Sequence, residues 1–407
     1  MKYIDFVDLK YKPAETDLIC TFYVEPEGIS LKEAAGGVAA ESSIGTWTEL
    51  TTAEPYVAKL AAHVFSIEDN LAKIAYPIEL FEQGNMPNIL SSVAGNVFGL
   101  KALKNLRLND VELPAELVKS FKGPRFGIEG IRKLLKVPER PFVGTIIKPK
   151  LGLKTADHAR VAYEAWAGGC DIVKDDENLS SQRFNPFEER VAKTLENRDK
   201  AEEETGERKV YMVNVTAETE TMLKRAEYVL DHGGEYVMVD ILTCGFSALQ
   251  TLRDQNFKLV VHAHRAGHAA FTKNPKHGIA MQVIAKVSRI IGVDQLHVGT
   301  VVGKMSETKK EVLENIGALK AEMSGLKPVM PVASGGLHPR LVPALMETFG
   351  KDFVIQAGGG IHGHTDGTFA GATAMRQAVD ATLEGKTLEE YAKTHKELRI
   401  ALELWKD

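Results

Sequence analysis

GGCDIVKDDEN, residues 168–178, is a short apolar run that ends in one lysine and three carboxylates. Side chains alternate along an extended strand, so Lys174 and Asp176 are predicted to share a face. Glu177 can join them only if the strand ends there and the chain turns. A group of oxygens suits a hard divalent ion such as Mg²⁺, but an ammonium cannot ligate a metal. If the cluster holds a cation, Lys174 must balance the charge of the carboxylates or be chemically changed. The alternative to a cation site is a solvated strand end with ordinary ion pairs.

Short apolar runs alternate with longer amphipathic ones from about residue 140 onward. This rhythm predicts a repeated βα unit. Short strands each followed by a helix, without a GxGxxG after the first, favour a (β/α)₈ barrel over a dinucleotide-binding sheet. The eight predicted strands are Phe142–Lys148, Asp171–Lys174, Lys209–Val215, Tyr236–Asp240, Leu259–His264, Gln295–Val298, Val329–Ser334 and Phe353–Ala357. The predicted helices are Thr155–Ala167, Pro186–Thr205, Glu218–His232, Gly278–Ile291, Thr308–Met323, Pro339–Phe349, Thr368–Leu383 and a terminal helix over Leu388–Trp405.

The pattern before residue 125 differs and predicts a separate, smaller α+β domain. Its strand-like segments are Leu18–Val24, Val57–Ile67 and Leu71–Pro77, and its helical segments are Leu31–Glu41 and Met86–Gly95. Gly123–Val137, which opens with Gly-Pro and continues as a short helical pattern, is the predicted linker. We expect an N-terminal domain over residues 1–125 and a barrel with a C-terminal helix over residues 126–407.

Composition restricts the classes of partner. The 407 residues carry a formal net charge of −5 and no basic block, which argues against nucleic acid as a ligand. The three cysteines are far apart and predict neither disulfides nor a zinc site. The sequence shows no signal peptide and no apolar stretch long enough to span a bilayer. We expect a soluble cytoplasmic protein without a membrane partner.

Polar residues collect where the predicted strands end, which is where barrel enzymes place their chemistry. Lys148 and Lys150 lie at the end of the first strand and are predicted to project to one side, and two close ammonium groups would favour a neutral amine able to transfer protons. His264 and Arg265 place a titratable group beside a fixed cation, as an anionic substrate requires. Each feature alone also fits solvated lysines or a packed histidine. The remaining strand ends carry Asp240, His262, His297, Ser334, Gly336 and the run Gly358, Gly359, Gly360, whose backbone amides can approach a phosphate.

The loop after the sixth strand, GTVVGKM at residues 299–305, differs from a P-loop in spacing and in its final residue. We reject the nucleotide interpretation. Two glycines flanking a loop that carries Lys304 fit a lid that brings a cation over a bound substrate.

These residues resemble the large subunit of ribulose-1,5-bisphosphate carboxylase/oxygenase, the Rubisco family, over essentially the whole chain. The matching strings are AESSIGTWT (residues 40–48), GNVFG (95–99), GTIIKPKLGL (144–153), GGCDIVKDDEN (168–178), HAHRA (262–266), GTVVGK (299–304), SGG (334–336) and GGG (358–360). The resemblance implies a (β/α)₈ barrel with a ferredoxin-like N-terminal α+β domain.

The resemblance also implies the chemistry. Lys174 would react with activator CO₂ to form a carbamate and would then hold Mg²⁺ together with Asp176 and Glu177. The carbamate would take the C3 proton of ribulose 1,5-bisphosphate, and addition of CO₂ followed by C2–C3 cleavage would give two 3-phosphoglycerates, with O₂ as the competing gas. Lys148 and Lys150 would handle protons at the substrate carbons, His264 protons at the sugar oxygens, and Lys304 the new carboxylate. The phosphates would contact Arg265, His297 and Ser334 at one end and Thr46, Trp47, Lys304, Gly336, Gly358 and Gly359 at the other.

In this family Glu41, Thr46, Trp47 and Asn96 reach the site from a neighbouring subunit. The resemblance therefore implies a homodimer or an assembly of dimers, with no small subunit expected. Met305-Ser306-Glu307 after the lid lysine departs from the commoner Leu-Glu-Gly, and the chain ends soon after the terminal helix. These features resemble the compact archaeal form III, in which the substrate arises from nucleotide salvage.

Two rival functions differ in the residues that they require. A Rubisco-like enolase or isomerase of the methionine-salvage type typically replaces the lid lysine or the N-terminal glutamate segment, whereas Lys304, Glu41 and Asn96 are present here. A regulatory sugar-phosphate-binding protein without turnover would be expected to lose Lys148 or Lys174, and both are present. The sequence therefore favours the carboxylase.

Overall fold

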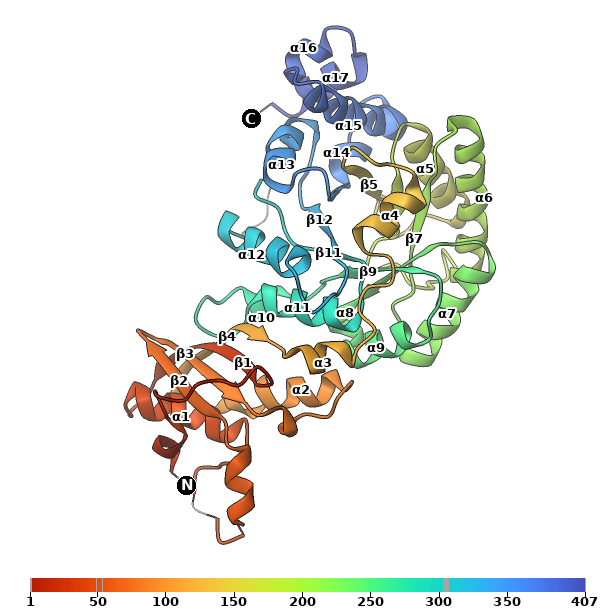
Figure 1. Cartoon of the computed structure of the whole chain (residues 1–407). Helices are drawn as coiled ribbons and strands as arrows, with labels where there is room; N and C mark the ends of the chain where they lie inside the picture. Colours follow the sequence, from red (N-terminus) through yellow and green to blue (C-terminus); the bar gives the residue numbers. More distant parts are fainter. Residues whose placement is uncertain (1, 49, 53, 303–306, 407) are drawn as a thin grey trace. The chain divides into compact units, whose positions relative to one another are not determined.

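The computed structural model describes residues 2–48, 50–52, 54–302 and 307–406 (Figure 1). The chain divides into two compact units. The first unit comprises Met1–Lys122, Gly267–Ile291 and Glu322–Leu326, and the second comprises Gly123–Ala266, Gly292–Ala321 and Lys327–Asp407. The expected division into domains over residues 1–125 and 126–407 stays a prediction.

The second unit is built around a closed barrel of eight parallel strands in the order β11-β12-β13-β5-β6-β7-β8-β9. All eight predicted strands are present, so the (β/α)₈ prediction is confirmed. The strands are almost wholly buried and rich in Val, Ile and Met, because helices cover the outside of a parallel barrel. They are β5 (Phe142–Ile146), β6 (Ile172–Lys174), β7 (Val210–Asn214), β8 (Tyr236–Asp240), β9 (Val260–His264), β11 (Gln295–His297), β12 (Met330–Ser334) and β13 (Val354–Ala357).

Helices surround these strands in Figure 1, and most begin within two residues of their predicted starts. The helices of the barrel unit are α4 (Gly127–Leu135), α5 (Thr155–Ala167), α6 (Phe187–Thr205), α7 (Thr219–Asp231), α8 (Ile241–Cys244), α9 (Phe246–Asp254), α12 (Lys309–Lys320), η5 (Pro339–Leu341), α13 (Val342–Phe349), α14 (Gly359–His362), α15 (Gly367–Leu383), α16 (Leu388–Ala392) and α17 (Lys396–Leu404). Helices α8, α9 and α14 were not predicted.

Helix α4 lies inside the segment predicted to be a linker, and it closes the amino-terminal end of the barrel. Ile128, Ile131 and Leu135 pack in one cluster with buried residues of the strands, including Phe142 and Met330. Asp294 fixes the start of this helix, because its Oδ1 accepts hydrogen bonds from the amides of Phe126 and Gly127 at 2.6 and 2.9 Å. The segment is thus part of the barrel core.

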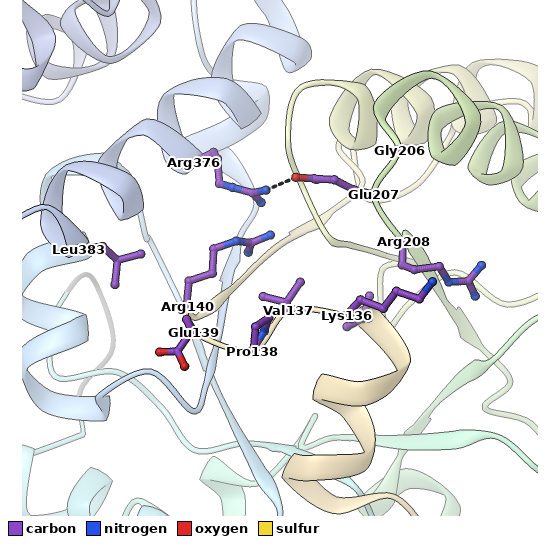
Figure 2. Close-up of a pocket in the computed structure, with 11 residues that line it drawn as sticks. Lys136, Val137, Pro138, Glu139, Arg140, Gly206, Glu207, Arg208, Arg376 and Leu383 are labelled. Atoms are coloured by element: carbon purple, nitrogen blue, oxygen red, sulfur yellow. Dashed lines mark hydrogen bonds and ion pairs between the residues drawn. The ribbon is translucent and has the colours of Figure 1, made fainter.

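A buried ion-pair network ties the same end of the barrel together. Asp171, directly before β6, accepts two hydrogen bonds of 2.7 Å from the guanidinium of Arg140. Arg376 on α15 contacts Asp171 at 3.4 Å and Glu207 at 2.5 Å. Arg140, Arg376 and Glu207 line a pocket of about 400 Å³ together with other residues that precede β5 and β7 and with α15. Figure 2 shows this pocket and the contact between Arg376 and Glu207. The pocket lies at the amino ends of the strands, opposite to the ends where barrel enzymes place their active sites.

The first unit contains a five-stranded sheet in the order β10-β4-β1-β3-β2, antiparallel except for the β10–β4 pair. Helix α1 begins with a capping box in which Ser30 and Glu33 bond each other's backbone amides. The α+β prediction is confirmed. The elements are η1 (Tyr3–Phe6), β1 (Leu18–Pro26), α1 (Leu31–Glu41), η2 (Pro55–Leu60), β2 (His63–Glu68), β3 (Leu71–Tyr76), η3 (Ile78–Leu80), α2 (Met86–Val93), η4 (Asn96–Gly99), β4 (Leu103–Glu112), α3 (Ala115–Lys119), α10 (Ala269–Thr272), β10 (Gly278–Ile279) and α11 (Met281–Ile291).

Two predicted elements of this unit were wrong in part. The segment Val57–Ile67 is a 3₁₀ turn followed by β2, because Pro55 opens a helical turn rather than a strand. The helix predicted from Gly278 begins at Met281, and the two residues Gly278–Ile279 pair with β4. Strand β4 itself was not predicted.

The predicted terminal helix Leu388–Trp405 is two helices, α16 and α17. His395 Nδ1 lies 2.8 Å from the carbonyl oxygen of Tyr391, and the Thr394 hydroxyl donates to the same oxygen at 3.4 Å. In a continuous helix, the backbone amide of His395 would donate to the carbonyl oxygen of Tyr391, but here these two side chains contact that oxygen. In the part of the chain that the structure describes, no helix combines the length and the apolar character needed to cross a membrane.

The ion-pair network predicts a large effect of one substitution. Arg140→Met removes the bidentate partner of the buried Asp171, so we expect the free energy of unfolding to fall by about 3 kcal/mol. Urea unfolding measures the change. Lys351→Met is the matched control, because the Lys351–Glu139 pair is 52% and 82% exposed and is expected to contribute less than about 1 kcal/mol. Equal midpoints for the two variants would contradict the prediction.

Candidate active site

The chain turns directly after β6, as the sequence required for Glu177 to join Lys174 and Asp176. Strand β6 ends at Lys174, and the amide of Leu179 donates to the carbonyl oxygen of Asp176 at 2.9 Å. Lys174 and Asp176 are buried, with exposed fractions of 0% and 1%. Asp175 alternates to the other side, where it contacts a separate set of residues.

Two lysines and two carboxylates form the centre of the site. Lys148 Nζ contacts Asp176 Oδ2 at 2.8 Å, and Lys174 Nζ contacts Glu177 Oε2 at 3.3 Å. Lys174 also donates to the backbone carbonyl of Asp175 at 2.8 Å. Among the described residues, no three His, Cys, Asp or Glu side chains are grouped to hold a metal ion.

Glu177 is held in its ionised form. Burial alone would raise the pKa of its carboxyl group, but the charges of Lys174 and His264 and the hydrogen bonds outweigh burial and lower the pKa to about 2. The side chain keeps 28% of its surface exposed. It is therefore an anion that remains accessible from the open end of the barrel.

His264 is oriented by Asp240 across the end of the barrel. Its Nδ1 lies 2.7 Å from Asp240 Oδ1, and its Nε2 lies 3.7 Å from Glu177 Oε2. A carboxylate can only accept a hydrogen bond, so Nδ1 carries the proton. Nε2 is then the nitrogen that faces Glu177 and can exchange a proton with a ligand.

A chain of buried and partly buried side chains continues from His264 to Ser334. The rings of His264 and His297 have centroids 4.8 Å apart, and His297 Nδ1 lies 2.7 Å from the Ser334 hydroxyl. His297 Nε2 is 2.9 Å from His262 Nε2. Burial, then the neighbouring positive charges, lowers the pKa of both His262 and His297 well below the usual value. Both rings are therefore neutral at pH 7.

Arg265 supplies a fixed cation next to this chain. Its Nη2 donates to Glu307 at 2.6 Å, and the residue is only 5% exposed. Within the described part of the chain, its other terminal nitrogen, Nη1, is buried without a hydrogen-bond partner. A buried cationic donor of this kind favours an anionic ligand.

The remaining predicted barrel residues differ in how closely they join the centre. A Cβ atom at Gly358 would lie 3.1 Å from Lys148 Cε, so glycine leaves room for this lysine. Gly336 and Gly359 are exposed after β12 and β13. Lys148 and Lys150 do not face the same partner. Strand β5 ends at Ile146, so the alternation of side chains does not extend to Lys150. The Lys150 side chain is exposed, and its Nζ lies 3.4 Å from Asn178 Oδ1.

Asn214, at the carboxyl end of β7, was missed. Its side-chain amide donates to the carbonyl oxygens of Glu177 and Leu179, both at 3.0 Å. It thereby fixes the turn that presents the two carboxylates. The signal was available, because Asn214 is the polar residue next to the end of the predicted strand Lys209–Val215.

Five predicted site residues are not tested by this geometry. Lys304 lies outside the described residues. The other four belong to the first compact unit, so their role in a neighbouring subunit's site stays a prediction; they are Glu41, Thr46, Trp47 and Asn96. Trp47 is 81% exposed, which leaves its ring free to contact another molecule.

The closed barrel with lysines, carboxylates and a histidine at the carboxyl ends of its strands defines a (β/α)₈-barrel enzyme. Residues 127–405 match the family model of the ribulose bisphosphate carboxylase large chain, catalytic domain, and residues 5–117 match that of its N-terminal domain. The chain belongs to the ribulose bisphosphate carboxylase large-chain family, as the resemblance predicted.

Relatives match over nearly their whole length. The ribulose bisphosphate carboxylase of Methanocaldococcus jannaschii is 53% identical, and the match covers 99% of this chain and 100% of that protein. The octameric Rubisco of Pyrococcus horikoshii has a TM-score of 0.97 at 51% identity, covering 100% of this chain and 98% of that one. The dimeric archaeal Rubisco of Hyperthermus butylicus has a TM-score of 0.93 at 46% identity, covering 99% of each chain.

The pKa of Glu177 predicts part of the acid sensitivity of the metal-free protein. Because folding lowers this pKa from 4.5 to about 2, the stabilisation is complete above pH 4.5 and is lost as the pH falls towards 2. With allowance for partial exposure, we expect wild type to lose about 2 kcal/mol more than Glu177→Gln across that interval. Urea unfolding at several pH values measures the difference. Glu139→Gln, at an exposed glutamate, controls for the loss of one carboxylate, and parallel curves for wild type and Glu177→Gln would refute the prediction.

Proposed function

We propose that this chain is a ribulose-1,5-bisphosphate carboxylase/oxygenase. The observation that carries the proposal is the buried amine of Lys174, held 3.3 Å from Glu177 and next to Asp176, in a member of the Rubisco family. The proposed enzyme adds CO₂ to ribulose 1,5-bisphosphate and cleaves the C2–C3 bond to give two 3-phosphoglycerates. O₂ is the alternative gas.

Charge at the centre of the site supports activation by CO₂. Lys148 and Lys174 balance Asp176 and Glu177, so the four side chains carry no net charge when both lysines are protonated. Conversion of the Lys174 ammonium to a carbamate, with loss of two protons, changes its charge from +1 to −1. The group then carries a charge of −2 and offers three oxygen ligands, a donor set that Mg²⁺ accepts. Mg²⁺ bound there would stabilise the negative charge that develops on the substrate oxygens.

The described side chains then divide the proton transfers. The carbamylated Lys174 takes the C3 proton of the substrate. His264 exchanges protons with the sugar oxygens through Nε2, because Asp240 occupies Nδ1. Lys148 handles protons at the substrate carbons, helped by Lys150. Lys304 is proposed to stabilise the new carboxylate, although it lies outside the described residues.

The two phosphates are proposed to bind at opposite sides of the barrel end. One contacts Arg265, His297 and Ser334, whose buried donors include the unpaired Arg265 Nη1 of the described structure. The other set consists of Thr46, Trp47, Lys304, Gly336, Gly358 and Gly359. Because Glu41, Thr46, Trp47 and Asn96 are proposed to come from a neighbouring subunit, at least a homodimer is required, and the dimeric and octameric relatives support such an assembly. We further propose a cytoplasmic enzyme with no small subunit, and a substrate from nucleotide salvage.

A labelling experiment tests the carboxylase. Wild-type protein incubated with labelled bicarbonate, Mg²⁺ and ribulose 1,5-bisphosphate is expected to form 3-phosphoglycerate with acid-stable label. Lys174→Arg keeps the positive charge but cannot form the carbamate, so turnover is expected to fall at least about 10³-fold. Lys351→Arg makes the same change at an exposed position and is expected to retain wild-type turnover. Failure of wild type to label the product, together with enolisation of another sugar phosphate, would favour the Rubisco-like enolase.

The lid lysine separates the two chemical stages. Lys304→Ala is expected to abolish carboxylation while part of the enolisation remains, because enolisation depends on Lys174 and the carboxylates. Exchange of the substrate C3 proton with solvent deuterium measures enolisation independently of the product. Loss of both activities in a folded variant would show that the role given to Lys304 is wrong.

A further inference from the structure

Asp175 is the third carboxylate of residues 168–178, and the proposed chemistry does not use it. It is fully buried, on the opposite side of the chain from Lys174 and Asp176. Both of its carboxylate oxygens are surrounded by donors. Tyr211 OH donates to Oδ1 at 2.6 Å, and the backbone amide of Asn214 donates to Oδ2 at 3.0 Å.

Two further groups complete the surroundings of Asp175. His158 Nε2 on α5 lies 3.1 Å from Oδ1, and Arg190 Nε on α6 lies 3.3 Å from Oδ2; both are ion-pair contacts without hydrogen-bond geometry. His158 and Arg190 are 2% and 0% exposed. Burial would raise the pKa of Asp175, but Arg190, His158 and Tyr211 lower it to about 2, so the carboxylate stays ionised. We call Asp175, His158, Arg190 and Tyr211 the Asp175 clamp.

The clamp fixes a main-chain atom that touches the reactive lysine. The carbonyl oxygen of Asp175 accepts the 2.8 Å hydrogen bond from Lys174 Nζ. The side chain of the same residue is held by two helices and a neighbouring strand, so this peptide group has little freedom to rotate. Arg190 also donates to the carbonyls of Asn185 and Ser180 at 2.9 and 2.7 Å, which extends the restraint to the segment after Glu177.

We propose that Asp175 is a positioning residue that sets how readily Lys174 is carbamylated; this inference rests on the proposed function. In the reaction, the ammonium of Lys174 loses two protons to solvent, and the nitrogen lone pair forms an N–C bond to CO₂. The electron pair of one C=O π bond moves onto its oxygen, which becomes a carboxylate oxygen. The carbamate nitrogen keeps one N–H. The Asp175 carbonyl is placed to accept that N–H, and this turns the carbamate oxygens towards Asp176 and Glu177.

Carbamate formation is measured directly in the full-length protein. ¹³C-labelled CO₂ is titrated at fixed pH and saturating Mg²⁺, and ¹³C NMR follows the carbamate carbon. Tyr211→Phe removes one donor from the clamp and keeps the ring, so we expect the CO₂ concentration for half-saturation to rise about 5-fold. The KM for ribulose 1,5-bisphosphate is expected to stay within about 2-fold.

Tyr236→Phe is the matched control. Tyr236 is a fully buried tyrosine on β8 whose hydroxyl has no hydrogen-bond partner within the described structure. For this variant, the CO₂ concentration for half-saturation is expected to remain within about 2-fold of the wild-type value. Equal values for Tyr211→Phe and Tyr236→Phe would overturn the positioning role. Wild type that forms no carbamate at all would instead contradict the proposed function.

A second pair of variants covers the case in which Tyr211→Phe does not fold. His158→Gln keeps an N–H donor within reach of Asp175, whereas His158→Met has a similar volume and no donor. We expect half-saturation within about 2-fold of wild type for Gln and about 5-fold higher for Met. A merely structural role would lower the urea midpoint of both variants and leave half-saturation unchanged, and that result would overturn the proposal.

Discussion

The site depends on one constraint: a fully buried lysine amine that is held between a carboxylate and a backbone carbonyl. Lys174 Nζ contacts Glu177 Oε2 at 3.3 Å and the Asp175 carbonyl at 2.8 Å. A buried charge is costly without partners, and here the two carboxylates of the site offset two ammonium groups. If the amine becomes an anionic carbamate, the four central side chains are no longer neutral but carry a net charge of −2. The proposed affinity for a divalent cation follows from this change in net charge.

The barrel supplies this constraint through its alternation of side chains. Strand β6 and the two residues after it direct Lys174 and Asp176 towards the site and Asp175 towards the helices outside. Asp175 thus anchors its own peptide group to the surrounding helices and strand, while its neighbours Lys174 and Asp176 face the ligand. In the part of the chain that the structure describes, the opposite end of the barrel has no comparable group of reactive residues. Arg140 and Arg376 there contact Asp171 and Glu207, and α4 fills the core.

Much of the barrel could be predicted from the sequence, because apolar strands of a parallel sheet and amphipathic helices have different periods. The eight strands and the polar residues at their ends follow directly from that pattern. Helix breaks made by side chains, such as the one at Thr394 and His395, leave no glycine or proline and were not predicted. The contacts of Asp175 with α5, α6 and β7 could not be read from the sequence, because they join residues that the fold alone brings together. The contribution of a neighbouring subunit came only from the resemblance.

Mg²⁺ affinity, measured by calorimetry on metal-free protein with and without CO₂ at one pH, tests the central claim most directly. The account predicts that CO₂ raises the affinity at least about 10-fold in wild type, because the four central side chains go from no net charge to −2. It also predicts that this dependence disappears when residue 174 cannot form a carbamate. Equal affinity in CO₂-free and CO₂-saturated buffer would contradict the account.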